Sequence, residues 1–409
     1  MNAVLVLQLA RFGDLLQTKR LIGSLAATGK GVHLAVDSSL EALARLVYPG
    51  VVVHSLPVHS APDPVALRQS LEALAALRFS EVHALNFSGL SLSLTGMFDP
   101  ATVRGYRLVS GQLHKDPWPA MAFRWTRNRR LGGLNLVDFW AGFTRPMLPP
   151  QAVNPVAAPK GGGLGVVLAG RNARRSLPID VLAAIIPAAL SRVSVPRVYL
   201  LGAETERPAA KALMGRLKAA TLSTVVDLTG RTGWNGLIET VAGLDRVLTP
   251  DTGTMHLAAH LGTPVTAFFL SSAWCHETGP YGLGHTVWQA VRECSPCLEA
   301  APCPHGLACL EPFRTREMLR LLTGKGLDAP PPGLVGFETG FDALGVLNRP
   351  MAGVDSGFAE RGRFRAFLAR HLGLAPGQDA PPAPDLAEQL VADPDFMLDK
   401  PPHSYDIFT

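Results

Sequence analysis

The chain has 409 residues, of which 47% are hydrophobic and 17% are charged, a composition typical of folded rather than disordered proteins. A chain of this length is too long to fold around one ordinary hydrophobic core and suits two domains. The formal net charge of +5 favours an anionic ligand or surface. An aromatic content of 7% and the lack of a lysine-rich tail argue against nucleic acid as a partner.

The first part of the chain alternates short apolar segments with amphipathic ones. Strands are predicted at 3–9, 32–36, 51–56, 81–85 and 102–106, and helices at 15–26 and 64–77. We interpret 3–9 as a strand rather than part of a signal peptide, because Arg11 and Asp14 follow it at once. No apolar run is long enough to span a bilayer, so we expect a cytoplasmic protein.

A segment rich in Pro, Gly and Ala, 145–163, is predicted to link two domains. A second alternating region follows it, with strands at 164–168, 197–201, 224–228, 246–248 and 265–269, and helices at 179–190, 204–219, 237–242 and 254–260. We therefore predict Rossmann-like domains over 1–150 and 151–326. Residues 327–409 read as a helical and irregular extension, partly disordered, to which we assign no chemistry.

Strands that alternate with helices form parallel sheets, whose ligands bind beyond the carboxyl ends of the strands. Two such α/β domains that face a central cleft would hold two substrates. The loop 9–14 follows the first strand, and Asp14 stands where a helix begins. Asp14 is therefore either an ordinary helix cap or a general base, with Arg11 and Gly13 beside it in the cleft.

The segment 250–259 follows a strand and opens an Ala-rich helix. Free backbone N–H groups at such a helix start, together with Thr252, Gly253 and His256, suit a phosphate. The alternative is a plain capping motif, in which Asp251 and Thr252 are caps and His256 is a packed side chain.

Three arginines follow the strand at 164–168. Arg171, Arg174 and Arg175 suit a diphosphate, because guanidinium groups match phosphate oxygens, although such loops are often merely solvated. Glu206 lies in another strand-to-helix loop. It would either bind a ribose hydroxyl or serve as a favourable acid in a first helical turn.

Four of the five cysteines fall within sixteen residues, namely Cys294, Cys297, Cys303 and Cys309. His305 lies between the last two. Four sulfurs and an imidazole could bind zinc or an iron–sulfur cluster, but the paired spacing of a zinc ribbon is absent. Buried thiols or a local disulfide are the alternatives, and the pattern leaves the choice open.

Several of these motifs resemble glycosyltransferase family 9, the ADP-heptose:lipopolysaccharide heptosyltransferases. The resemblance covers about the first 325 residues. It rests on RFGDLLQT at 11–18, ARRSLP at 173–178, GAETE at 202–206, DTGTMHLAAHLGTP at 251–264, GPYG at 279–282 and CSPC at 294–297. The chain departs from the family pattern at Arg175, where the family has lysine, and at Leu177-Pro178, where Trp-Pro is common. Near the end of the first helix the usual proline is missing, and Lys19 and Arg20 stand there.

The resemblance implies a GT-B fold, an inverting mechanism and no required metal or other cofactor. By position, Asp14 is similar to the catalytic base and Arg175 to the cation that pairs with the donor phosphates. Thr252, Gly253 and His256 resemble the diphosphate loop, while Asp251 would lie near the donor sugar. Glu206 resembles the carboxylate that holds the ribose.

The implied reaction moves a heptose or related sugar from an ADP-sugar to a lipopolysaccharide core or similar glycan. The partners would be that donor and a lipid-linked acceptor at the inner membrane face, with peripheral membrane contact. Alternatives are a non-catalytic sugar-nucleotide-binding protein and a nucleotide-sugar epimerase or hydrolase. A dinucleotide oxidoreductase is disfavoured, because no G-x-G-x-x-G follows the first strand.

Overall fold

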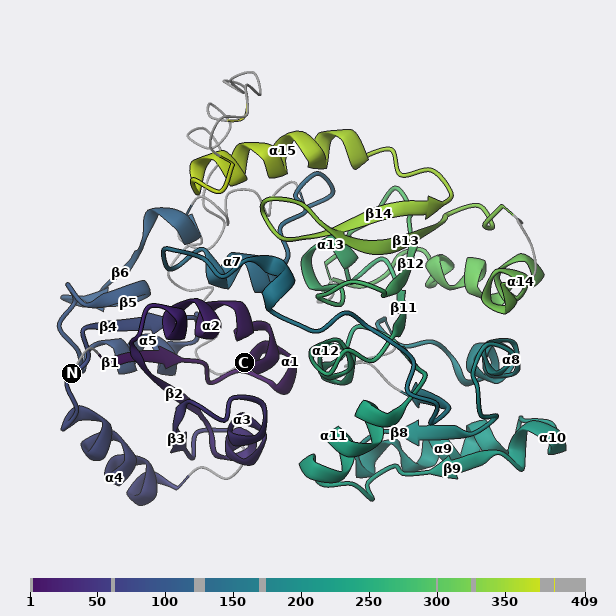
Figure 1. Cartoon of the computed structure of the whole chain (residues 1–409), viewed down its shortest axis with the longest axis horizontal. Coiled ribbons are helices and arrows are strands. Elements are labelled where there is room, and N and C mark those ends of the chain that lie inside the picture. The colour runs from purple at the N-terminus through teal and green to yellow at the C-terminus, as the bar shows by residue number, and fades with distance from the viewer. Residues whose placement is uncertain are drawn as a thin grey trace. The chain divides into compact units, whose positions relative to one another are not determined.

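The computed structural model describes residues 3–59, 63–120, 129–168, 174–298, 301–324, 329–375 and Leu386. By contacts between residues the chain divides into two units. The first comprises 1–132, 136–149 and 366–409, and the second comprises 133–135 and 150–365. Each contains one sheet with helices packed against it (Figure 1). In the described part of the chain, no helix combines the length and the apolarity that a membrane span requires.

The first unit contains a six-stranded sheet in the order β3-β2-β1-β4-β5-β6. The strands are β1 (Ala3–Leu7), β2 (Gly31–Asp37), β3 (Val52–Leu56), β4 (Glu81–Ala84), β5 (Val103–Val109) and β6 (Gln112–Lys115). The first five are parallel, and β6 returns antiparallel to β5. The helices are α1 (Phe12–Gln17), α2 (Lys19–Ala27), α3 (Glu41–Val47), α4 (Pro64–Ala75), α5 (Gly89–Thr95) and α7 (Leu136–Ala141).

The second unit contains an eight-stranded sheet in the order β14-β13-β12-β11-β10-β7-β8-β9. Its strands are β7 (Leu164–Val167), β8 (Val198–Leu201), β9 (Val225–Asp227), β10 (Arg246–Thr249), β11 (Val265–Phe269), β12 (Thr286–Ala290), β13 (Leu334–Phe341) and β14 (Val346–Ala352). Its helices are α8 (Ile179–Leu190), α9 (Arg207–Met214), α10 (Ala219–Leu222), α11 (Trp234–Gly243), α12 (Gly253–His260), α13 (Cys275–Thr278), α14 (Arg316–Thr323) and, across the division between the units, α15 (Phe358–His371).

Both sheets have the strand order of a Rossmann fold, in which the first strand lies between the second and the fourth. All ten strands predicted from the sequence form, and the expected α/β class is confirmed. Apolar side chains that are almost fully buried form the core of each unit. Leu5, Leu7 and Val82 lie in the first core, and Leu164, Val166 and Leu248 lie in the second.

The C-terminal region contains more regular structure than its sequence pattern indicates. Strands β13 and β14 form a hairpin whose first strand pairs antiparallel with β12 and extends the second sheet. Gly336, Gly340 and Pro350 interrupt the apolar alternation, and glycine and proline normally argue against a strand. Pro350 is tolerated because β14 is the edge of the sheet. The predicted helix near 358–372 corresponds to α15, and residues 376–385 and 387–409 lie outside the described residues.

Arg20, one of the departures from the family pattern, is a buried structural residue. Its Nη1 atom lies 2.5 Å from Oδ1 of Asp138 in α7, and its Nε donates to the carbonyl oxygen of Leu148 at 2.9 Å. The side chains of Arg20 and Asp138 are 1% and 0% exposed. Removing one partner would leave a buried charge without its counter-ion, which proteins tolerate poorly.

We expect Asp138→Ala to lower the free energy of unfolding by about 3–5 kcal/mol, because Arg20 would keep its buried charge. Urea denaturation monitored by circular dichroism measures this change. The matched control is Glu72→Ala, which removes a carboxylate that is exposed beside Arg68 and should change stability by less than about 1 kcal/mol. Similar losses in the two variants would contradict a structural role for the buried pair.

Candidate functional site

Most of the predicted site residues that the structure describes lie at the point in each sheet where the strand order reverses. In the first unit this point lies between β1 and β4, and in the second it lies between β7 and β10. Chains leaving neighbouring strands there turn to opposite faces, which opens a crevice at the carboxyl ends. Asp14 follows β1, Arg175 follows β7, and Asp251 follows β10.

Asp14 lies in the first turn of α1, which begins at Phe12 after the N-cap Arg11. Its Oδ2 accepts a hydrogen bond from the backbone N–H of Arg11 at 3.2 Å, so the carboxylate does act as a local cap. Gly13 occupies a helical position beside it. Asp14 is nevertheless only half-buried, and it lines a cavity of about 710 Å³ with Arg11, Asp37 and Asn86.

Asn86 fixes the loop that carries Asp14, and the sequence pattern does not single it out. Its Oδ1 accepts the N–H of Leu9 at 2.6 Å, and its Nδ2 donates to Oε1 of Gln8 at 2.6 Å. Asn86 follows β4, the strand beside β1, so its position after a strand at the reversal point is the signal that could have identified it. On the other side of the cavity, the Asp37 carboxylate accepts from the N–H groups of Ser39 at 3.1 Å and His59 at 2.8 Å.

The segment around Asp251 opens helix α12 in the second unit. Thr252 is the N-cap, and its side-chain oxygen accepts from the N–H of Met255 at 3.4 Å, so the capping interpretation is correct for this residue. Gly253 is the first helical residue. Backbone N–H groups at the start of a helix attract anions.

His256 lies one turn into α12 and is 8% exposed. Burial lowers its pKa from 6.5 to about 4, because the charged ring would lose its hydration. The ring is therefore neutral at physiological pH. It can hydrogen-bond to a phosphate but adds no positive charge to the site.

Arg175 and Asp251, which are 76 residues apart in the sequence, form an ion pair. The distance between Arg175 Nη1 and Asp251 Oδ2 is 3.0 Å. The same Oδ2 accepts from the Thr278 hydroxyl at 3.1 Å. Arg171 lies outside the described residues, and Arg174 points to a different partner, described below.

Glu206 lies in the 3₁₀ turn Glu204–Glu206, at the carboxyl end of β8. Its Oε2 accepts the N–H of Ala203 at 2.6 Å, and its Oε1 accepts from the Thr205 hydroxyl at 3.0 Å. The carboxylate therefore caps its own turn, as the simpler interpretation expects, and β8 lies next to β7 at the same edge of the sheet.

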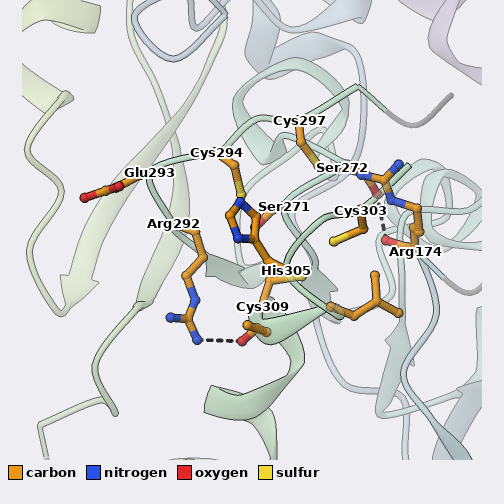
Figure 2. A pocket seen from close by; sticks show the side chains of 12 residues that line it. Arg174, Ser271, Ser272, Arg292, Glu293, Cys294, Cys297, Cys303, His305 and Cys309 are labelled. Carbon is orange, nitrogen blue, oxygen red and sulfur yellow. Dashed lines mark hydrogen bonds between the residues drawn. The ribbon is translucent and has the colours of Figure 1, made fainter. Parts of the chain in front are cut away.

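The four clustered cysteines and His305 line a single pocket of about 330 Å³ in the second unit (Figure 2). Arg174 lies on its wall, where it donates to the carbonyl oxygens of Leu298, at 3.0 Å, and of Ala301, and to Sγ of Cys297 at 3.0 Å. The described residues contain no group of three or more His, Cys, Asp or Glu side chains placed to hold a metal ion. No disulfide joins any of these four cysteines.

Residues 185–306 match the family described as glycosyltransferase family 9 (heptosyltransferase). This match confirms the resemblance seen in the motifs. The matched span contains Glu206, Asp251, Thr252 and His256, whereas Asp14 and Arg175 lie outside it. No curated protein sequence matches the chain.

Three solved structures with a similar fold are glycosyltransferases. E. coli ADP-heptose LPS heptosyltransferase II matches with a TM-score of 0.53 and 15% identity, over 70% of this chain and 89% of that one. A family 9 glycosyltransferase from Veillonella parvula has a TM-score of 0.56 and 13% identity, over 71% and 88% of the two chains, and E. coli heptosyltransferase WaaC with ADP has a TM-score of 0.53 and 18% identity, over 70% and 93%. At these identities the likeness establishes the fold alone, which is the expected GT-B fold with two α/β domains.

The lowered pKa of His256 predicts a loss of stability in acid. The unfolded chain binds a proton on this residue below a pKa of 6.5, whereas the folded chain binds one only near 4, so the free energy of unfolding falls as the pH decreases through this window. Between pH 7 and about pH 5, we expect the free energy of unfolding to fall by about 2 kcal/mol less in His256→Gln than in the wild type. Urea denaturation at both pH values measures the difference. An exposed-site control, His114→Gln, should behave as the wild type, and an undiminished acid loss in His256→Gln would contradict the assignment.

Proposed function

We propose that this chain, a glycosyltransferase of family 9, transfers a heptose or related sugar from an ADP-sugar to a hydroxyl of a lipopolysaccharide core or similar glycan, with inversion at the anomeric carbon. The observation that carries the proposal is the placement of Asp14 in one unit, and of Arg175 with the N-terminus of α12 in the other, at the reversal points of their sheets. These are the positions where sheets of this type bind ligands.

Asp14 would act as the general base. It would take the proton of the acceptor hydroxyl while the acceptor oxygen attacks the anomeric carbon and the bond to the diphosphate breaks. The cavity beside Asp14 contains polar side chains together with Phe12 and Phe87, a mixture that suits a sugar. The Asn86 hydrogen bonds to Gln8 and Leu9 would keep the loop before Asp14 in place.

The departing nucleotide diphosphate gains negative charge as the glycosidic bond breaks. The N-terminus of α12 and the guanidinium of Arg175 would stabilise this charge in the second unit. Neutral His256 would contribute a hydrogen bond, and Glu206 would bind the ribose. The similar heptosyltransferase WaaC is described with ADP, which supports an adenine nucleotide as the leaving group here.

The acceptor we infer is a lipid-linked glycan at the inner face of the membrane, reached from the cytoplasm by peripheral contact. The formal net charge of +5 supports this, because it favours approach to an anionic surface. No metal ion or other cofactor has a step in the proposed reaction.

We expect Asp14→Asn to reduce transfer roughly 100-fold or more while the affinity for ADP stays near that of the wild type. Asparagine can still accept the hydrogen bond from Arg11, so the variant removes the base and keeps the cap. Sugar transfer to extracted core acceptors and calorimetric ADP binding are the two measurements. Asp63→Asn, which alters the capping aspartate of α4, is the matched control and should transfer normally. Near-normal turnover by Asp14→Asn would remove the base assignment, and consumption of the donor without any acceptor would indicate an epimerase or hydrolase.

We expect ADP, at a hundredfold excess over its Kd, to stabilise the folded protein by about 2.7 kcal/mol, and UDP and GDP to stabilise it less. A thermal-shift panel measures this. Arg175→Gln should raise the Kd for ADP roughly tenfold, because a charged donor to the diphosphate is lost. Arg216→Gln makes the same charge change at an exposed position and is the control. Equal ADP affinity in the two variants would exclude Arg175 from the diphosphate site.

A further inference from the structure

We propose that Thr278 is a positioning residue of the donor site, where it holds the Asp251 carboxylate so that Arg175 is directed toward the donor diphosphate. This inference rests on the proposed function, because it deepens the account of the same site. Thr278 belongs to none of the motifs that indicate the donor loop, and it reaches Asp251 from a different element of the fold.

Asp251 is the acceptor shared by two side chains. Its Oδ2 atom receives a hydrogen bond from Arg175 Nη1 at 3.0 Å and another from Thr278 Oγ1 at 3.1 Å. Asp251 is 7% exposed, so water has little access to replace either donor. The orientation of its carboxylate therefore depends on both neighbours.

Arg175 is the neighbour that matters for the donor. A guanidinium binds carboxylates and phosphates by the same forked geometry, so Asp251 and the diphosphate compete for it or share it. Thr278 satisfies part of the hydrogen-bonding capacity of Asp251, so the carboxylate holds the Arg175 guanidinium less strongly. It also limits the directions in which Asp251 can turn.

The placement of Thr278 is rigid because α13 is fixed at its other end. The N–H of Cys275, the first residue of α13, donates to Gln289 Oε1 in β12 at 3.0 Å. The carbonyl oxygen of Cys275 accepts from Asn348 Nδ2 in β14 at 3.1 Å. Both contacts are buried, and side chains locked in this way hold a site to the tolerance that function requires. The C-terminal hairpin therefore supports the residue that holds Asp251.

The loop before α13 is attached to the backbone beside Arg175. The Ser272 hydroxyl donates to the carbonyl oxygen of Arg174 at 2.7 Å, on the wall of the cysteine pocket (Figure 2). The neighbouring Ser271 carbonyl accepts the N–H of Cys297 at 2.8 Å. One short segment, 271–278, thus contacts the backbone next to Arg175 at its start and the Asp251 carboxylate at its end.

The test is Thr278→Val, which has nearly the shape of threonine but lacks its hydroxyl. We expect the KM for the sugar nucleotide and the Kd for ADP to rise roughly tenfold, because a hydrogen bond to a charged acceptor is lost. The value of kcat should change less, since Thr278 is not assigned to the proton transfer. Thr278→Ser keeps the hydroxyl and should restore wild-type values. Thr240→Val, in α11, is the control, because its half-buried hydroxyl bonds only to the helix carbonyl of Gly236 in the contacts described.

A second measurement separates positioning from a general structural effect. In an Arg175→Gln background, Thr278→Val should add little further loss of ADP affinity, because its action passes through Arg175. Unchanged donor affinity in Thr278→Val, a loss equally large in Thr278→Ser, or full additivity with Arg175→Gln would each overturn the inference. A wild-type chain that binds no nucleotide would instead count against the proposed function. If Thr278→Val does not fold, Thr278→Ala takes its place, both in the comparison with Thr278→Ser and in the combination with Arg175→Gln.

Discussion

The reversal of strand order in each sheet is the constraint on which the site depends. Parallel strands are joined by crossover connections. Where two neighbouring connections run to opposite faces of the sheet, the loops that begin them diverge and leave a crevice at the carboxyl ends of the strands. In this chain those loops follow β1 and β4 in one unit and β7 and β10 in the other. The polar residues at these points lie at the edge of the sheet, where the proposed function places its ligands.

Three of the candidate residues also have a local structural role. Asp14 caps α1, Thr252 caps α12 and Glu206 caps its own 3₁₀ turn. A helix start exposes N–H groups that need an acceptor, and the same N–H groups attract an anionic ligand. Structural and functional interpretations of these residues are therefore compatible. The cap positions the side chain, and the proposed chemistry uses the position.

The C-terminal hairpin links a region without recognisable motifs to the candidate donor site. Strand β13 completes the pairing of β12, and β14 contributes Asn348, which binds the backbone of Cys275. The backbone N–H of His285 likewise donates to the Thr339 hydroxyl of β13 at 3.1 Å. The hairpin thus fixes α13 from the side opposite the β10–α12 turn, although none of its own residues lies among the predicted site residues.

The sequence by itself determined the alternation of strands and helices, the two α/β units and the loops at the carboxyl ends, because each depends on the periodicity of apolar residues over short spans. It also identified the two partners Arg175 and Asp251 separately, each in its own strand-to-helix loop. Only the tertiary structure decided that they form an ion pair, that Thr278 shares the carboxylate, that Arg174 turns toward the cysteine pocket, and that Arg20 is buried against Asp138. These contacts join residues 27 to 123 positions apart. No local pattern encodes them, since they arise when the sheet brings distant loops to one edge.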